Sequence, residues 1–207
     1  MFSNEINPNL SFRIVILVVL IVGVDDTLAN WYAGARRTVD ANGITALIST
    51  PNDPLFLVEI PLSGESNWVS TYDVDQNGKR DWLQAGWVMY HWYSTPKQYV
   101  EWCIDCIGDQ GTYEREDEFA TQSWGTTIDY WVSRDTGSRW CAYTDGLVRF
   151  CVDNLHSDPV EVFARSEVHA SALNELNTTF DEVRYKDPND NIFKLFDGQI
   201  SWIEDFP

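Results

Sequence analysis

The sequence has 207 residues, with 14 Lys and Arg against 32 Asp and Glu, and a formal net charge of −18. Its 10 Trp, 9 Tyr and 10 Phe residues and its 44% hydrophobic fraction describe one globular domain and exclude disordered, collagen-like and coiled-coil chains. Because a surface of this charge repels phosphate groups, nucleic acid and anionic lipid are excluded, and we expect neutral or cationic partners.

The chain begins with an apolar segment. Residues 14–24 read IVILVVLIVGV, follow an arginine and precede a Thr-Leu-Ala sequence that ends at Ala29. This is the layout of a secretory signal peptide with cleavage after Ala29, and the run is shorter than the ~20 residues of a membrane-spanning helix. The sequence predicts a signal peptide over 1–29 and a secreted domain over 30–207 without membrane contact after cleavage. An uncleaved anchor is the alternative.

The rest of the chain alternates between short apolar or aromatic stretches and clusters of Asp, Asn, Gly and Pro, such as the cluster at 187–191. This pattern predicts strands, with one weakly helical piece at 170–175. In chain order, the predicted strands are 44–49, 55–60, 68–72, 82–93, 99–104, 124–134, 139–143, 147–152, 160–169, 182–186, 192–196 and 200–203. A dozen strands in one domain must bury two inner faces, so the predicted fold is all-β, an antiparallel sandwich or a barrel.

Alternation along two of these strands assigns their faces. In 82–93, one side carries Gln84, Gly86, Val88, Tyr90 and Trp92, and the other side carries Leu83, Ala85, Trp87, Met89 and His91. In 160–169, one side carries Glu161, Phe163, Arg165, Glu167 and His169, and the apolar side carries Val160, Val162, Ala164 and Val168. A face that mixes polar and aromatic side chains is typical of the wall of a ligand groove.

The four cysteines are Cys103, Cys106, Cys141 and Cys151. An even number in an exported chain predicts disulfides. Cys141 and Cys151 flank an Asp-Gly turn dipeptide, and a three-residue loop centred on Gly146 would place their sulfurs across a strand pair. Cys103 then pairs with Cys106. A four-thiolate zinc site is the alternative, although only the first pair has the usual ligand spacing.

Two acids are candidates for chemistry. Glu101 in YVEWC and Glu167 in RSEVH lie in predicted strands among aromatic or apolar residues, where an acid is out of place unless it is paired or functional. The alternative for each acid is a salt bridge, of Glu167 with Arg165 or of Glu101 with a nearby base. The sequence lacks the G-x-S-x-G and HExxH motifs of serine hydrolases and zinc hydrolases, and we expect no cofactor.

A weak calcium-loop pattern follows the strand at 68–72. Asp73, Asp75, Asn77 and Asp81 occupy ligand positions of such a loop, but its twelfth position is Gln84 instead of a bidentate Glu. Runs of this composition usually form hairpin turns, which is the alternative interpretation.

An ordered set of short motifs resembles the glutamic peptidases (eqolisins). The motifs are Asn30-Trp31 with Gly34-Ala35, Trp68-Val69, Leu83-Gln84-Ala85-Gly86 and Tyr99-Val100-Glu101-Trp102, with Glu167 following Gln84 by 83 residues. The similarity covers residues 30 to about 170. It implies a concanavalin-like jelly roll of two seven-stranded antiparallel sheets and an endopeptidase that works at acid pH without metal.

The resemblance also implies roles for individual residues. Gln84 and Glu167 would be adjacent on the concave face, with Glu167 as general base and then acid, and with Gln84 stabilising the oxyanion. Trp31 and Trp68 would line the substrate cleft. Two further acids, Glu101 and Asp73, would orient the catalytic pair.

Two other functions fit the same sequence. A binding module for carbohydrate would use aromatic side chains of one strand as stacking surfaces, with Trp82, Trp87, Tyr90 and Trp92 as the candidates. A glycosidase would need the carboxyl groups of Glu101 and Glu167 about 5–5.5 Å or 6.5–9.5 Å apart. The partner is thus a polypeptide substrate or a glycan, and we expect the protein to be a monomer.

Overall fold

The computed structural model describes residues 12–13, 30–52, 64–90, 92–107, 110–156, 158, 160–169, 178–197 and 199–205. Every regular element in these ranges is a β-strand. In chain order, the strands are β1 (Phe12–Arg13), β2 (Asn30–Ala41), β3 (Gly43–Ser49), β4 (Gly64–Val74), β5 (Arg80–Tyr90), β6 (Lys97–Ile107), β7 (Gln110–Thr121), β8 (Thr127–Thr136), β9 (Arg139–Thr144), β10 (Leu147–Val152), β11 (Val160–His169), β12 (Thr179–Lys186), β13 (Phe193–Leu195) and β14 (Gln199–Asp205).

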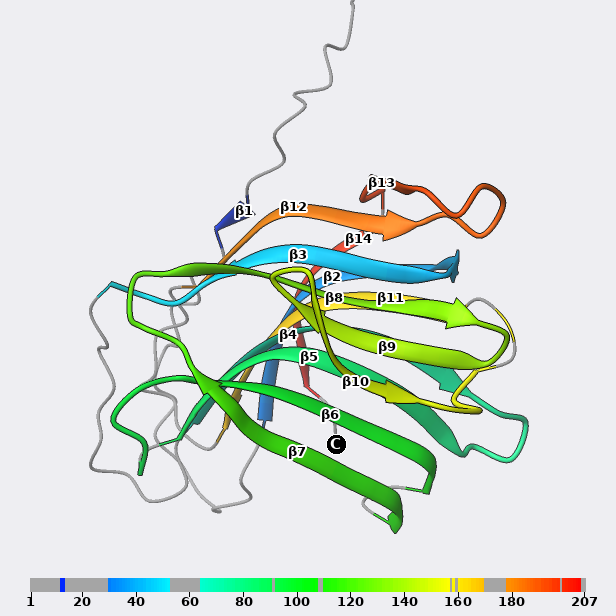
Figure 1. Ribbon diagram of the computed structural model, residues 1–207, viewed down its shortest axis with the longest axis horizontal. Helices are drawn as coiled ribbons and strands as arrows, with labels where there is room; N and C mark the ends of the chain where they lie inside the picture. Colours follow the sequence, from blue (N-terminus) through cyan, green and yellow to red (C-terminus); the bar gives the residue numbers. More distant parts are fainter. Residues whose placement is uncertain are drawn as a thin grey trace, which may run out of the picture.

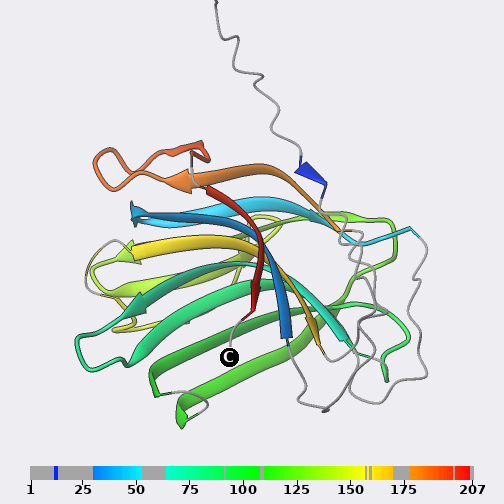
Figure 2. The ribbon, with the colours of Figure 1, turned by 180° about the vertical axis from the view of Figure 1, so that it is seen from behind.

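The strands form two seven-stranded sheets that pack against each other. The first sheet has the order β1-β12-β3-β8-β9-β10, with β13 paired to β12, and lies in front in Figure 1. The second has the order β14-β2-β11-β4-β5-β6-β7 and lies in front in Figure 2. All pairings are antiparallel. The protein is therefore an all-β, two-sheet antiparallel jelly-roll sandwich, as predicted.

Most predicted strands are present with shifted ends, and β10 and β11 have the predicted bounds. The prediction missed β2 and β7. β7 reads QGTYEREDEFAT and lies at the end of the second sheet, where a strand pairs on one side only and can carry charges on both faces. β2 contains Gly and two Arg residues, which hide its alternation. The predicted strand at 55–60 and the helical piece at 170–175 lie outside the described residues.

The apolar side of each long strand faces the other sheet. Leu83, Ala85, Trp87 and Met89 of β5, which the alternation placed on one side of the strand, all belong to the main core. Trp87 is fully buried, and its indole N–H donates a hydrogen bond to the carbonyl of Ser49 at 3.2 Å. The prediction that Trp87 offers a stacking surface to a glycan is therefore wrong, because period-two alternation turns this residue into the core.

Both predicted disulfides are present, Cys103–Cys106 and Cys141–Cys151. These cysteines are therefore not available as thiolate ligands, and the zinc alternative is wrong. Cys141 lies directly across from Cys151 on β9 and β10, with their Cα atoms 4.1 Å apart.

The hairpin that carries the second disulfide differs from the prediction. Thr144 pairs with Leu147, so the loop has two residues, Asp145 and Gly146, and both have positive φ angles as a type I′ turn requires. A register shift between Val148 and Phe150 then inserts one extra residue in β10. This bulge, and not a three-residue loop, brings the two cysteines opposite each other.

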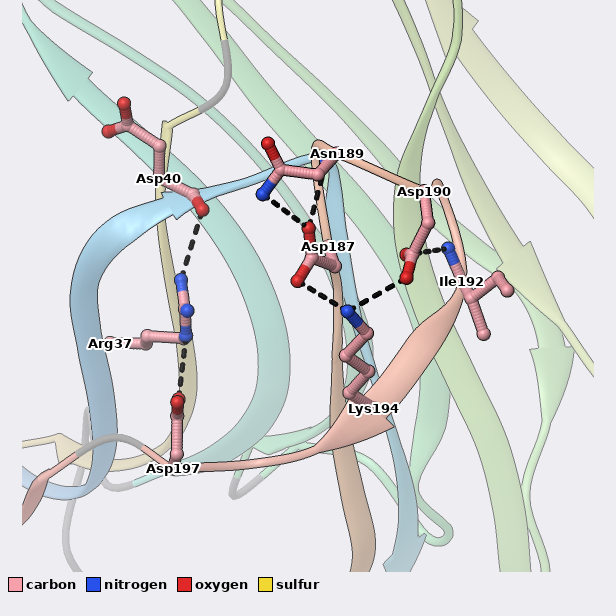
Figure 3. A network of polar contacts seen from close by, with 8 residues as sticks. All are labelled: Arg37, Asp40, Asp187, Asn189, Asp190, Ile192, Lys194 and Asp197. Carbon is pink, nitrogen blue, oxygen red and sulfur yellow. Dashed lines mark hydrogen bonds and ion pairs between the residues drawn. The ribbon is translucent and has the colours of Figure 1, made fainter.

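The predicted turn at 187–191 joins β12 to β13 and is closed by one ammonium group (Figure 3). Lys194 Nζ lies 2.7 Å from Asp187 Oδ2 and 2.8 Å from Asp190 Oδ2. Asp187 Oδ1 also accepts the backbone N–H of Asn189 at 2.8 Å. The hydrogen bond from Lys194 is the main reason that the pKa of Asp187 falls to about 2. A chain cation thus fills the centre of this acidic turn.

The structure describes only Phe12 and Arg13 of the predicted signal peptide, and these two residues pair with Phe180 and Thr179 at the start of β12. The apolar run at 14–24 lies outside the described residues, so the signal peptide stays a prediction. In the ranges that are described, no helix has the length and apolar character needed to cross a bilayer.

We predict that replacing both Cys141 and Cys151 by Ala lowers the free energy of unfolding by about 2–4 kcal/mol, because the disulfide restricts the unfolded chain. Guanidinium denaturation measures the change. The matched control replaces Cys103 and Cys106, which close a shorter loop, and should cost less. An equal or larger loss in the control would contradict this explanation.

Candidate functional site

The outer face of the second sheet carries the candidate site. Since the inner positions of β4, β5, β6 and β11 fill the core, the alternate positions point away from the first sheet. Four of them stand side by side in register across the sheet, Phe163 of β11, Ser70 of β4, Gln84 of β5 and Glu101 of β6. We call this set the central row.

Gln84 and Glu101 contact each other directly. Gln84 Nε2 donates one hydrogen bond to Glu101 Oε2 and a second to the hydroxyl of Tyr99 at 3.2 Å. An ionised carboxylate only accepts hydrogen bonds, so the amide must turn its N–H groups toward Glu101 and its carbonyl oxygen away. Both amide hydrogens of Gln84 are thereby engaged, while Gln84 and Glu101 remain only partly buried.

Glu167 lies on the same face but in a different row. It stands in register with Ser66 and, through β4, with Val88, which is four residues along β5 from Gln84. Two strand spacings and four residues separate the Cα atoms of Gln84 and Glu167 by roughly 16 Å. Glu167 is 9% exposed, and the Ser66 hydroxyl donates to its carboxylate at 3.5 Å.

The register therefore does not bring Gln84 and Glu167 together as the eqolisin resemblance implied. Phe163 occupies the position of β11 that stands in line with Gln84, and Glu167 follows four residues later. Glu101 is one strand further from Glu167, which gives a Cα separation of roughly 20 Å. This separation does not match the carboxylate pair of a glycosidase.

A small apolar cluster adjoins the central row on the outer face. It consists of Trp68, Val88 and Tyr99, with Tyr90 and Tyr93 packed against it. Trp68 is only 4% exposed, so its ring contributes to this cluster more than to an open surface. The cluster gives the hydroxyl of Tyr99 a fixed position beside Gln84.

The aromatic residues at the end of β5 are more accessible. The predicted strand 82–93 ends at Tyr90, and a turn closed by a hydrogen bond from Tyr93 N to Tyr90 O follows it. Trp92 in this turn is 56% exposed and stacks on Tyr90, with ring centroids 4.6 Å apart. Trp82, at the start of β5, is partly buried. The ring of Trp82 therefore lies near one end of β5, and the rings of Tyr90 and Trp92 lie at or just beyond the other end.

The other predicted binding residues lie away from the central row. The backbone of Trp31 in β2 pairs with Val168 and Asp205. Asp73 lies near the end of β4 across from Asp81, and its Oδ1 accepts the N–H of Val74 at 2.9 Å. The structure therefore does not place Asp73 beside Gln84.

The calcium-loop candidate forms the hairpin turn between β4 and β5. Asp75 Oδ1 accepts the backbone N–H groups of Asn77 and Lys79, each at 2.8 Å. These bonds lower the pKa of Asp75, with the bond from Lys79 as the largest cause. Asp81 Oδ1 accepts the N–H of Asp105 at 2.6 Å. In the described part of the chain, no group of three or more His, Cys, Asp or Glu side chains could hold a metal ion.

Sequence reasoning missed Tyr99 and Ser70 as members of the site. A signal was present for Tyr99, because it precedes Glu101 by two residues and must share its face. Ser70 carries no such signal, since only strand pairing places it between Phe163 and Gln84.

Comparisons with known proteins find similar structures of more than one activity. No protein-family model and no curated protein matches the sequence. Similar solved structures include scytalidoglutamic peptidase with a peptide-based transition state analogue, at 17% identity over 87% of this chain and 76% of that chain, with a TM-score of 0.45. A prokaryotic β-1,3-1,4-glucanase (lichenase) from a mouse hindgut metagenome has 12% identity over 80% and 82%, with a TM-score of 0.46.

A third similar structure is the κ-carrageenase of Pseudoalteromonas carrageenovora in complex with an oligotetrasaccharide of κ-carrageenan. Its identity is 12%, the TM-score is 0.40, and the match covers 74% of this chain and 66% of the carrageenase. Because all three TM-scores are below 0.5 and all three identities below 25%, we draw no conclusion about function from these likenesses.

We predict that Gln84→Glu destabilises the protein at pH 7 and much less at pH 3. Two ionised carboxylates would then meet, which costs about 1–3 kcal/mol and raises their pKa values in the folded state. Stability is therefore present at low pH and lost as pH rises. Urea unfolding at both pH values measures the effect. Gln84→Met, which has no charge, should show the same loss at both; a pH-independent loss in Gln84→Glu would contradict the prediction.

Proposed function

We propose that the outer face of the second sheet binds a neutral glycan chain. The observation that carries this proposal is the hydrogen-bond arrangement of the central row. Both amide hydrogens of Gln84 are used within the protein, by Glu101 and Tyr99. The group of this pair that remains for a ligand is an acceptor, the amide oxygen of Gln84. Sugar hydroxyls supply the donors that such a surface needs.

Aromatic side chains support the same ligand class. Along the outer side of β5, Trp82 and Tyr90 are eight residues apart, which corresponds to roughly 27 Å. Trp92 extends this line with a ring that is more than half exposed. Apolar faces of sugar rings pack well on aromatic rings at such positions, so a chain of several sugars can contact Trp82, the central row and Trp92.

The negative net charge of the protein restricts the classes of glycan that it can bind. At a formal net charge of −18, sulfated and uronic-acid glycans are repelled before they reach the face. A neutral polysaccharide is not repelled in this way. The two disulfides suit an oxidising compartment. In this proposal the protein is exported through the segment 1–29, and the domain 30–207 acts as a monomer.

The glycan proposal predicts that Trp92→Ala and Gln84→Ala each weaken binding roughly five- to tenfold, since a lost aromatic contact or a lost hydrogen bond costs about 1 kcal/mol. Screening against neutral polysaccharides followed by isothermal titration calorimetry measures the affinity. Trp131→Ala is the matched control, because Trp131 stacks on Tyr143 and belongs to β8 of the first sheet. Equal losses in the control, or no glycan bound by the folded protein, would refute the proposal.

A glutamic-peptidase-like activity is the second candidate. The contact between Glu101 and Gln84 favours it, since an acid that orients the glutamine is what the eqolisin resemblance implied. In this proposal Glu167 takes a proton from the attacking water and returns it to the leaving amine, and Gln84 stabilises the oxyanion. This needs a rearranged state, in which one amide hydrogen of Gln84 leaves Tyr99 or Glu101 and one water reaches both catalytic residues.

The peptidase candidate predicts acid-optimal cleavage of an unfolded protein substrate that pepstatin does not inhibit. Purified protein is assayed from pH 2 to 8, together with Glu167→Gln and Gln84→Ala. Loss of cleavage in both variants is expected, because neither residue can perform the other's role. Glu161→Gln is the control, since Glu161 pairs with Arg36 on the same face and should retain activity. Absence of cleavage by the folded wild type would rule out this candidate.

A further inference from the structure

Four buried polar side chains lie between the two sheets, on the side of β4 that faces away from the candidate site. Glu65 and Asn67 belong to β4, Ser166 to β11, and Thr178 immediately precedes β12 of the first sheet. Glu65 is 1% exposed and the other three are completely or almost completely buried. The group therefore joins strands of the second sheet to the start of a strand of the first.

Hydrogen bonds connect the four residues. Glu65 Oε1 accepts the amide N–H of Asn67 at 2.7 Å and the hydroxyl of Thr178 at 2.9 Å. Asn67 Oδ1 in turn accepts the hydroxyl of Ser166. Each bond crosses from one segment to another or links two positions of β4. The carboxyl group of Glu65 is the centre of this arrangement, because it accepts from β4 and from the first sheet through one oxygen.

The surroundings of Glu65 hold no described cation. Met89 and Val168 stand beside it in the second sheet. The facing strands β3 and β8 contribute the buried core residues Ile44, Ala46, Ile48, Tyr130 and Val132. Of these, only Tyr130 titrates, and its burial raises its pKa, so it is uncharged below neutral pH.

Other ionisable side chains that the structure describes near these strands do not supply a counter-charge. Glu167 holds a neighbouring register position of β11 and is itself an acid. His156 contacts Thr71, six residues along β4, and burial lowers its pKa to about 3, so it is neutral. The buried Arg37 of β2 pairs with Asp197, as Figure 3 shows, at a register position six residues from Val168.

We propose that Glu65 makes the junction between the sheets pH-sensitive, holding it closed as a neutral carboxyl group in acid and weakening it when the proton is lost. A carboxylate buried without a cation is costly, because the lost hydration is not replaced by an opposite charge. Two donors on one oxygen recover only part of this cost. The same group thus stabilises the fold in one protonation state and strains it in the other.

The sign of the effect follows from the direction of the pKa shift. Burial is the largest cause and raises the pKa of Glu65 from 4.5 to about 7, while the bonds from Asn67 and Thr178 act in the opposite direction. A group whose pKa is higher in the folded state stabilises fully below its unfolded pKa. This contribution is lost as pH rises through about 7. The contribution of Glu65 to stability is therefore greatest in acid.

The test compares thermal unfolding of the full chain at pH 4 and pH 8. Glu65→Gln keeps the shape of the neutral carboxyl group and should remove roughly 5–10 °C of the decrease in Tm that the wild type shows between these pH values. Glu182→Gln, which removes an exposed carboxylate on β12, is the control and should keep the wild-type decrease. An unchanged decrease in Glu65→Gln would overturn the proposal.

A second pair of variants keeps the proposal testable if Glu65→Gln does not fold. Thr178→Val removes one donor to the carboxylate, which disfavours the ionised form and should move the pH of half-maximal Tm loss upward. Thr178→Ser retains the hydroxyl and should leave this pH unchanged. Carbon-13 NMR of labelled glutamate carboxyl groups reports the titration directly. The proposal fails if no glutamate of the folded wild type titrates above pH 6.

Discussion

Side chains alternate between the two faces of each strand, and the second sheet uses this alternation for two purposes. Leu83 and Ala85 of β5 are fully buried in the core, and Gln84 lies between them on the outer face. The orientation of Gln84 is therefore set by its neighbours and not by its own preference. A slip of one residue in β5 would bury Gln84 and expose Leu83. The same strand register is therefore required for the core and for the candidate site.

Polar groups on the inner side of the same sheet follow a different rule. On the outer face, Glu101 is only partly buried and accepts a hydrogen bond from Gln84. On the inner face, Glu65 has donors but no described cation, and burial makes its charged form costly. Two glutamates of one sheet are thus adapted to different tasks by their face alone. We propose that the inner one makes stability depend on pH, whereas the outer one orients Gln84.

The two candidate functions differ in what they require of Gln84. As part of a binding face, Gln84 acts through its carbonyl oxygen, and the hydrogen bonds to Glu101 and Tyr99 already orient it for this role. As an oxyanion stabiliser, it must free an N–H group and meet a water shared with Glu167, which stands two strands and four residues away. The binding function needs no rearrangement, which is why the geometry favours it.

Most of the strands, the residues that share a face in β5 and β11, and both disulfide pairings followed from the sequence, because alternation, turn residues and cysteine spacing are local properties. Glu101 was identified as a candidate from its aromatic neighbours, and Gln84 through the resemblance of its motif to the eqolisins. The pairing of strands was needed to show that Gln84 meets Glu101 and not Glu167. Three further features were not predictable from the sequence. They are the edge strand β7, the bulge beside Cys151 and the position of Ser70 in the central row. Which residues of different strands stand in one row depends on sheet order, register and bulges, and these arise from pairing between segments far apart in the chain.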